Sequence, residues 1–98
     1  MPRSRCYVYI VSNAARTVLY IGMAGNLYRR VWQHRTGFIE GFTKKYRVNR
    51  LVYCEALPNV QRAAARERQL KGWTRERKYA LIRSRNPAFR DLFPLLQL

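Results

Sequence analysis

Two short runs of β-branched and aromatic residues, close together near the N-terminus, constrain the fold most. Residues 6–12 read Cys-Tyr-Val-Tyr-Ile-Val-Ser, and residues 17–22 form a second run that ends at a glycine. Both runs have the composition of β-strands. Because only the polar segment 13–16 separates them, the sequence predicts an antiparallel hairpin.

The length of the connecting loop predicts how the two strands pair. A four-residue loop that closes Ser12 against Thr17 would place Tyr9 directly across from Tyr20, on one face of the sheet. Facing aromatic residues commonly stabilise antiparallel sheets, so this pair has a purely structural interpretation. The alternative is a functional site, which gains support if a charged side chain reaches the same face.

The helix expected after the hairpin carries charge on its own apolar stripe. Gly25-Asn26 predicts a turn and a helix cap, after which apolar residues recur at Leu27 and Val31. At about 100° per residue, Arg30 and His34 fall on the same stripe. Each has a structural explanation, because an arginine can snorkel at a core edge and a histidine suits a last helical turn. Together, on a stripe that should enter the core, they indicate a site.

The remainder of the chain predicts one more strand, two helices and a tail. Residues 51–55 have strand composition, and a helix is expected over about 58–71. A second helix is expected over about 74–84, between a threonine cap and an Asn-Pro stop. The apolar residues of 89–98 are expected to pack back on the sheet.

The charge of the chain narrows the class of partner. Lysine and arginine number 20 against 5 acidic residues, a net charge of +15 on 98 residues. A chain of this length has room for one core, so we expect a single domain over 1–98. A polyanion is the expected partner, with nucleic acid the default and a membrane surface the competitor. Because no apolar run reaches the roughly 18 residues of a spanning helix and no signal peptide is evident, we expect a cytoplasmic protein.

A basic segment over 37–49 has two interpretations. Its cations include Lys44, Lys45 and Arg47, and its aromatic residues are Phe38, Phe42 and Tyr46. Alternation of cations with aromatic rings suits phosphate contact combined with base stacking. A solvated loop whose aromatic rings enter the core fits the same pattern equally well.

One carboxylate lies on an apolar helix face. In the helix expected over 58–71, Ala63, Glu67 and Leu70 share a face with Lys71 at helical spacing. An ion pair between Glu67 and Lys71 would contribute only about 0.3–0.5 kcal/mol. A site for a hard divalent cation explains a carboxylate on that face better than such a weak pair does.

Taken in order, these residues resemble the GIY-YIG nuclease domain, and more narrowly its small stand-alone bacterial members. The resemblance covers roughly residues 6–92 and rests on Tyr7-Val8-Tyr9, Tyr20-Ile21-Gly22, Arg30, His34, Glu67 within Ala65 to Lys71, Leu70-Lys71-Gly72-Trp73-Thr74-Arg75 and Asn86-Pro87. The chain departs from the family at two positions. Tyr7 replaces the first glycine of the signature, and Ser12 stands where some relatives have a lysine.

The resemblance implies a fold, a cofactor and roles for individual residues. The implied fold is α+β: a small three-stranded antiparallel sheet flanked by helices. One divalent metal, Mg²⁺ or Mn²⁺, would be held by Glu67, and Arg30 would contact the phosphate. Tyr9 and Tyr20 would activate and orient the attacking water. His34 matches the helix histidine of the family and joins the expected catalytic set.

Two functions follow as hypotheses. The first is a metal-dependent DNA endonuclease in repair or recombination, specific for structure rather than sequence, with branched or single-stranded DNA as substrate. The second is a non-catalytic binder of DNA or RNA that keeps the fold. A basic peripheral membrane protein would need a helix with a bulky apolar face, which the alanine-rich helix lacks. The cations expected to contact nucleic acid are Arg29, Arg35, Lys44, Lys45, Arg47 and Lys71.

Overall fold

The computed structural model describes residues 5–37 and 41–96, with only the backbone of Phe42. Its elements are β1 (Cys6–Ser12), β2 (Leu19–Ala24), α1 (Leu27–Arg35), α2 (Phe42–Lys45), β3 (Arg50–Leu57), α3 (Val60–Lys71), α4 (Arg75–Arg85) and the 3-10 helix η1 (Phe93–Leu96). Phe38, one of the aromatic residues expected in the basic segment, lies outside the described residues, as does the side chain of Phe42.

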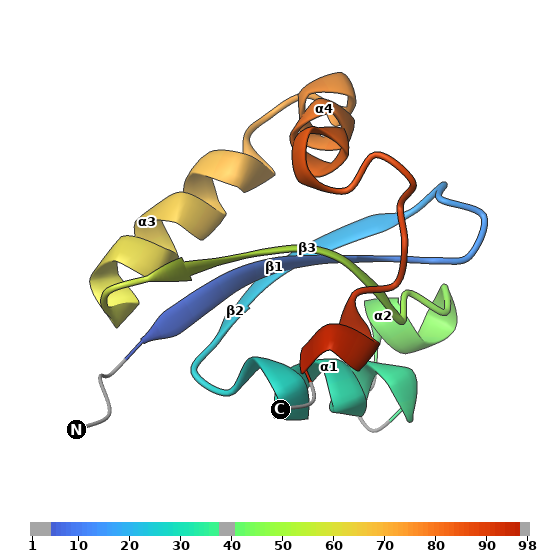
Figure 1. Ribbon diagram of the computed structural model, residues 1–98, viewed down its shortest axis with the longest axis horizontal. Coiled ribbons are helices and arrows are strands. Elements are labelled where there is room, and N and C mark those ends of the chain that lie inside the picture. The colour runs from blue at the N-terminus through green and yellow to red at the C-terminus, as the bar shows by residue number, and fades with distance from the viewer. Residues whose placement is uncertain (1–4, 38–40, 97–98) are drawn as a thin grey trace.

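The three strands form one antiparallel sheet in the order β2-β1-β3. Helices α3 and α4 lie on one face of this sheet, while α1, α2 and η1 lie on the other (Figure 1). This architecture confirms the expected α+β fold, a small three-stranded antiparallel sheet flanked by helices. In this strand order, β2 forms one edge of the sheet and β3 forms the other.

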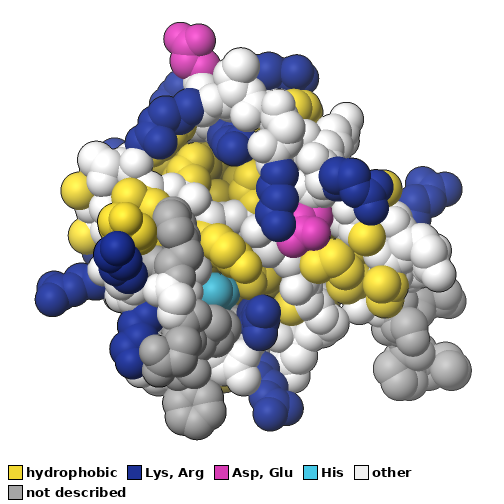
Figure 2. Space-filling model, turned by 180° about the vertical axis from the view of Figure 1, so that it is seen from behind, with side chains coloured by type: hydrophobic (Ala, Val, Ile, Leu, Met, Phe, Trp, Pro, Cys, Tyr) yellow, Lys and Arg dark blue, Asp and Glu magenta, His cyan; other side chains and the backbone are white. Residues whose placement is uncertain are grey.

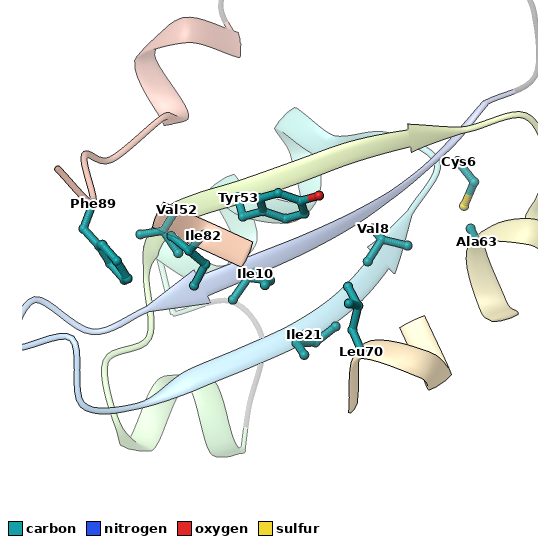
Figure 3. Packing of buried hydrophobic residues seen from close by; sticks show 10 residues of the cluster. All are labelled: Cys6, Val8, Ile10, Ile21, Val52, Tyr53, Ala63, Leu70, Ile82 and Phe89. Atoms are coloured by element: carbon teal, nitrogen blue, oxygen red, sulfur yellow. The ribbon is translucent and has the colours of Figure 1, made fainter. Parts of the chain in front are cut away.

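Strand β1 is central because its residues are apolar on both faces. Cys6, Val8 and Ile10 belong to the core cluster that α3 and α4 cover (Figure 3). Tyr9 and Val11 point the other way, into the cluster that includes residues of α1 and η1. Because such a strand is shielded from water, its backbone N–H and C=O groups need partners at both edges, and β2 and β3 supply them.

The register of the hairpin differs from the expected one by two residues. Tyr9 pairs with Gly22, and Tyr20 pairs with Val11 instead of with Tyr9. The reason lies in Asn13, whose side-chain oxygen accepts the N–H groups of residues 17 and 18, at 2.9 and 3.0 Å. These residues therefore belong to the loop, which is longer than four residues. Because the shift is an even number, Tyr9 and Tyr20 remain on one face, as diagonal neighbours.

Polar caps begin three of the helices where the sequence places them. Asn26, Asn59 and Thr74 precede α1, α3 and α4, and each side chain accepts a backbone N–H from the first turn. Helix α2 was not expected, because its four residues are too few for a periodic apolar pattern. No helix within residues 5–37 and 41–96 has the length and apolar character needed to cross a bilayer.

The C-terminal segment is tied to β3. The buried Asn86 side chain donates to the carbonyl of Val52 at 3.0 Å, directly after α4 ends. Further along, the backbone N–H of Leu92 donates to the carbonyl of Leu51 at 2.7 Å. Phe93 then joins the core cluster on the α1 side of the sheet. As far as it is described, the apolar tail therefore packs as expected.

Candidate active site

The Tyr9 phenol reaches the site by crossing over β2 at Gly22. The two residues are directly paired, and a Cβ atom on Gly22 would lie 2.6 Å from the Tyr9 hydroxyl oxygen and 2.7 Å from the ring carbon that bears it. Real Cβ atoms do not approach other heavy atoms that closely. Glycine is therefore required here for close approach and not for its backbone conformation.

The Tyr9 hydroxyl forms a hydrogen bond with His34 of α1. The Nε2 atom of His34 lies 2.9 Å from the Tyr9 hydroxyl, and its ring centroid lies 5.6 Å from that of Tyr20. The second ring nitrogen, Nδ1, lies 3.1 Å from the hydroxyl of Thr43 in α2. When Thr43 accepts the Nδ1 proton, Nε2 becomes the acceptor of the Tyr9 proton. The result is a buried chain of three side chains from β1, α1 and α2.

Burial fixes the protonation of both partners. It lowers the pKa of His34 to about 4, with help from the nearby Arg30 charge, so the ring is neutral at pH 7. Burial also raises the pKa of Tyr9 to about 12. The Arg30 guanidinium opposes this rise, whereas Tyr20 and the Glu67 carboxylate add to it. The phenol is therefore protonated at neutral pH.

The Arg30 side chain has a hydrogen-bond donor that no described residue uses. Its Nε is buried and, among the described residues, has no hydrogen-bond partner. Its hydrogen bond to the Gln33 side chain is long, at 3.5 Å, and its guanidinium also interacts with the Tyr9 phenol. Buried polar groups without partners are rare and call for an explanation. A guanidinium with a free donor beside a protonated phenol and a neutral histidine is suited to receive an anion.

Among the described acidic residues, Glu67 is the one whose charge raises the pKa of Tyr9. It extends from α3, its side chain is 22% exposed, and its charge acts on the Tyr9 phenol. Lys71 lies 3.4 Å from one of its oxygens. Figure 2 shows the face on which part of the histidine (cyan) is visible, not far from a carboxylate (magenta) with an adjacent cation (dark blue).

Two other carboxylates have structural partners that Glu67 lacks. Glu55 pairs with Arg66 at 2.7 Å and accepts a hydrogen bond from Tyr53. Asp91 pairs with Arg35 and also accepts a backbone N–H. Both thereby help to hold the fold together, whereas the one ion pair of Glu67 among the described residues is a long contact with a lysine.

The donor set at Glu67 fits one kind of metal ion. Among the described residues, no group of three or more His, Cys, Asp or Glu side chains gathers in a form that could hold a metal. That excludes a cage of protein ligands within this part of the chain. Mg²⁺ and Mn²⁺ suit carboxylate and water ligands, and Mg²⁺ is typically held by one or two carboxylates together with waters and substrate phosphates. A single partly exposed carboxylate, whose charge reaches the same phenol as the Arg30 charge, matches that pattern.

The cations expected to contact nucleic acid come from α1, from α2 with the loop after it, and from the end of α3. Arg29 is exposed on α1, Lys44 and Lys45 are exposed on α2, and Arg47 is exposed on the loop that follows. Lys71, 53% exposed, lies against Glu67. Arg35 differs, because it pairs with Asp91 and lies 4.7 Å above the Phe93 ring.

The geometry thus gathers Tyr9, Tyr20, Arg30 and His34 on the α1 face of the sheet. Glu67, on α3, is near enough for its charge to act on the Tyr9 phenol. Sequence reasoning missed Thr43, because the short helix that carries it gives no periodic signal. It also missed the reason for Gly22, which depends on the strand register. A different register would have placed the glycine opposite another residue.

Comparison with known proteins gives an independent view of the chain. Residues 5–80 match the model of the GIY-YIG catalytic domain. A UPF0213 protein of Syntrophus aciditrophicus is 34% identical over 85 residues, which cover 86% of this chain and 95% of that protein. A UPF0213 protein of Staphylococcus aureus is 37% identical over 79 residues, covering 81% and 95%.

A solved structure resembles the fold as well. The solution NMR structure of a UPF0213 protein from Bacillus halodurans aligns with a TM-score of 0.57 and 25% sequence identity. The alignment covers 89% of this chain and 92% of that one. The sheet and helices described above are therefore shared with an experimentally determined structure.

Proposed function

The chain belongs to the GIY-YIG family, a family of nucleases, and on that premise we propose that it is a divalent-metal-dependent DNA endonuclease. It would hydrolyse phosphodiester bonds with Tyr9, Tyr20, Arg30, His34 and Glu67. The observation that carries the proposal is the Arg30 side chain, whose buried Nε has no partner among the described residues and lies within a cluster of titratable groups.

Arg30 provides the phosphate site of the proposal. Its guanidinium has five donors in a planar fork, which matches two oxygens of a phosphate. A phosphate there would give the buried Nε an acceptor. In the transition state the phosphoryl oxygens gain negative charge, and a fixed arginine stabilises that charge more strongly than it stabilises the ground state.

The Tyr9–His34 pair supplies a path for the proton of the attacking water. With a pKa near 12, Tyr9 cannot act as a phenolate at pH 7. As a phenol that donates to His34 Nε2, it can accept a proton from water while it passes its own proton to the ring. Thr43 would hold the ring in the tautomer that this transfer needs. Tyr20, whose ring lies beside that of His34, would orient the water.

Glu67 is the residue that would hold the metal. Nucleases of this family generally use divalent metal ions, and the accessible carboxylate fits Mg²⁺ or Mn²⁺. When bound, such an ion would supply Lewis acidity and neutralise phosphate charge. Lys71, which contacts Glu67 now, would be free to turn toward a phosphate.

The proposed substrate is DNA recognised by its structure. A net charge of +15 favours phosphate-driven binding with a steep dependence on salt. Arg29, Lys44, Lys45, Arg47 and Lys71 are exposed and can make such contacts. Arg35 could join them only by leaving Asp91. Contacts of this kind carry no sequence information. The proposed substrate is therefore branched or single-stranded DNA, and the proposed setting is repair or recombination.

A cleavage assay at low salt tests the proposal. Plasmid, single-stranded and branched DNA are incubated with the protein in Mg²⁺, in Mn²⁺ and in EDTA. Arg30→Lys is compared with Arg29→Lys, a matched change one residue away on the exposed side of α1. We expect metal-dependent cleavage that Arg30→Lys abolishes and Arg29→Lys retains. Binding of every DNA without cleavage would instead support the non-catalytic binder.

A further inference from the structure

Arginine side chains lie over two aromatic rings on the face of the sheet that α3 and α4 cover. Trp73, which follows α3, has the guanidinium carbons of Arg66 and Arg77 at 5.4 and 4.1 Å from the centroid of its ring. Tyr53 of β3 has the guanidinium carbon of Arg85, at the end of α4, at 5.6 Å. We call these five residues the arginine–aromatic surface.

This surface lies across the sheet from the candidate active site. Tyr53 belongs to the core cluster that α3 and α4 cover (Figure 3), whereas Tyr9 belongs to the cluster on the α1 face. Tyr53 also comes from β3, while the Tyr9 phenol crosses over β2, and these two strands form opposite edges of the sheet. Helix α4 and helix α1, which carries Arg30, lie on opposite faces in Figure 1. The two sites are therefore separate surfaces of the molecule.

Two of the three arginines have hydrogen-bond donors to offer. Arg66 is engaged, because its guanidinium donates to Glu55 at 2.7 Å and to Gln69 at 2.8 Å. Arg77 and Arg85 are exposed, and among the described residues neither side chain forms an ion pair or donates a hydrogen bond. An aromatic ring limits the motion of a guanidinium but accepts no conventional hydrogen bond. These two arginines are therefore held in place with their donors available.

Positive charge dominates the helices that carry this surface. Residues 60–85 hold nine lysines and arginines against two glutamates. At the surface itself, Glu55 pairs with Arg66, so three guanidiniums face one carboxylate. Among the described residues, none of the exposed large hydrophobic side chains lies in α4. Because protein and membrane partners are bound largely through apolar contacts, the partner that fits this surface best is a phosphate backbone.

The spacing of the two available arginines calls for an extended partner. Arg77 and Arg85 are eight residues apart in α4, which is about 12 Å along the helix. Phosphates of duplex DNA recur about every 3.4 Å along the axis on each strand, so this spacing corresponds to roughly three to four base pairs. While each arginine stays over its own ring, a single small anion cannot reach both. The backbone of one duplex can.

We propose that the arginine–aromatic surface binds the phosphate backbone of a second DNA duplex while the candidate active site holds the first. Arg77 and Arg85 would contact phosphates, and no base would be read. Because the two sites lie on opposite faces of the sheet, one protein molecule would hold two DNA segments together. The inference rests on the proposed function only in taking DNA as the polyanion at the active site.

A capture assay in EDTA tests the inference without catalysis. A duplex immobilised on beads is loaded with less than one protein per duplex, and capture of a second, fluorescent duplex is measured at increasing salt. Arg77→Gln/Arg85→Gln is compared with Arg68→Gln/Arg83→Gln, which removes the same charge from exposed positions of α3 and α4 that contact no described ring. Sedimentation of each protein gives its oligomeric state, and thermal denaturation gives its stability.

We expect the wild type to capture the second duplex. At equal loading on the first duplex, Arg77→Gln/Arg85→Gln should reduce capture by at least about 10-fold, because two phosphate contacts are lost. The slope of log affinity for the second duplex against log salt should fall by about 1.8, since each phosphate contact to B-DNA contributes about 0.9. Arg68→Gln/Arg83→Gln should retain both capture and slope, and neither double variant should lower the midpoint of thermal unfolding.

Three results would overturn the inference. A wild type that captures no second duplex has only one DNA-binding surface. Equal losses in the two double variants would make total charge the cause. Capture by a dimer, through the active site of each copy, would be insensitive to Arg77→Gln/Arg85→Gln. A protein that captures the second duplex but never cleaves DNA in Mg²⁺ would keep this surface and lose the endonuclease proposal, so the two failures are distinguishable.

Discussion

Substitution Gly22→Ala tests the packing that carries the Tyr9 phenol across β2. The added Cβ would lie 2.6 Å from the Tyr9 hydroxyl oxygen, so the ring must move and its hydrogen bond to His34 Nε2 must break. Overpacking a core costs about 1–3 kcal/mol and a lost buried hydrogen bond about 1 kcal/mol more, so we expect a destabilisation of about 2–4 kcal/mol. For a domain of this size that corresponds to a fall in Tm of about 10–20 °C.

The assay is thermal and urea denaturation followed by circular dichroism, with DNA cleavage measured well below the new midpoint. Cleavage should fall by about 10²- to 10⁴-fold, because the displaced phenol can no longer transfer a proton. Gly25→Ala is the matched control, since a Cβ there meets nothing within 4 Å. It should be neutral or slightly stabilising. If Gly22→Ala is as stable and as active as Gly25→Ala, the described approach of Tyr9 to Gly22 is wrong.

Three further predictions concern the chain of hydrogen bonds behind Tyr9. The His34 pKa of about 4 lies below its unfolded value of about 6.5, so the unfolded state binds a proton first as the pH falls. The contribution of His34 to stability is therefore fully present above pH 6.5, and about 3 kcal/mol of it is lost as the pH falls toward 4. The free energies of unfolding of wild type and His34→Gln, measured by urea titration, should diverge over this pH range. Parallel curves would contradict the prediction. Thr43→Val should leave a buried ring nitrogen without a partner and cost about 1–3 kcal/mol, whereas Thr43→Ser should be nearly neutral in the same assay. The rate of cleavage should stay flat between about pH 6.5 and 9, because Tyr9 acts as a phenol; a slope of one that Tyr9→Phe abolishes would identify a phenolate instead.

Much of the fold could be predicted because its signals are local. The strand composition of β1, the caps Asn26, Asn59 and Thr74, and the glycine after α3 each depend on a few adjacent residues. The register of β2 could not be predicted from loop length. It depends on the Asn13 side chain, which takes the N–H groups of residues 17 and 18 and so lengthens the loop.

The same division applies to the candidate site. Arg30 and Glu67 stood out because a charge on an apolar helix face is detectable by helical spacing. Thr43 was invisible, since its four-residue helix has no period and its partner His34 is nine residues away.

The initial rate of cleavage by Glu67→Gln tests the central claim most directly. The variant keeps the size of the side chain and removes the charge that would hold the metal. Glu76→Gln, at an exposed position of α4, is the control. We expect Glu67→Gln to bind DNA as well as the wild type or more tightly, and to lose metal-dependent cleavage by at least about 100-fold, with Glu76→Gln fully active. Cleavage by Glu67→Gln at the wild-type rate would contradict the account.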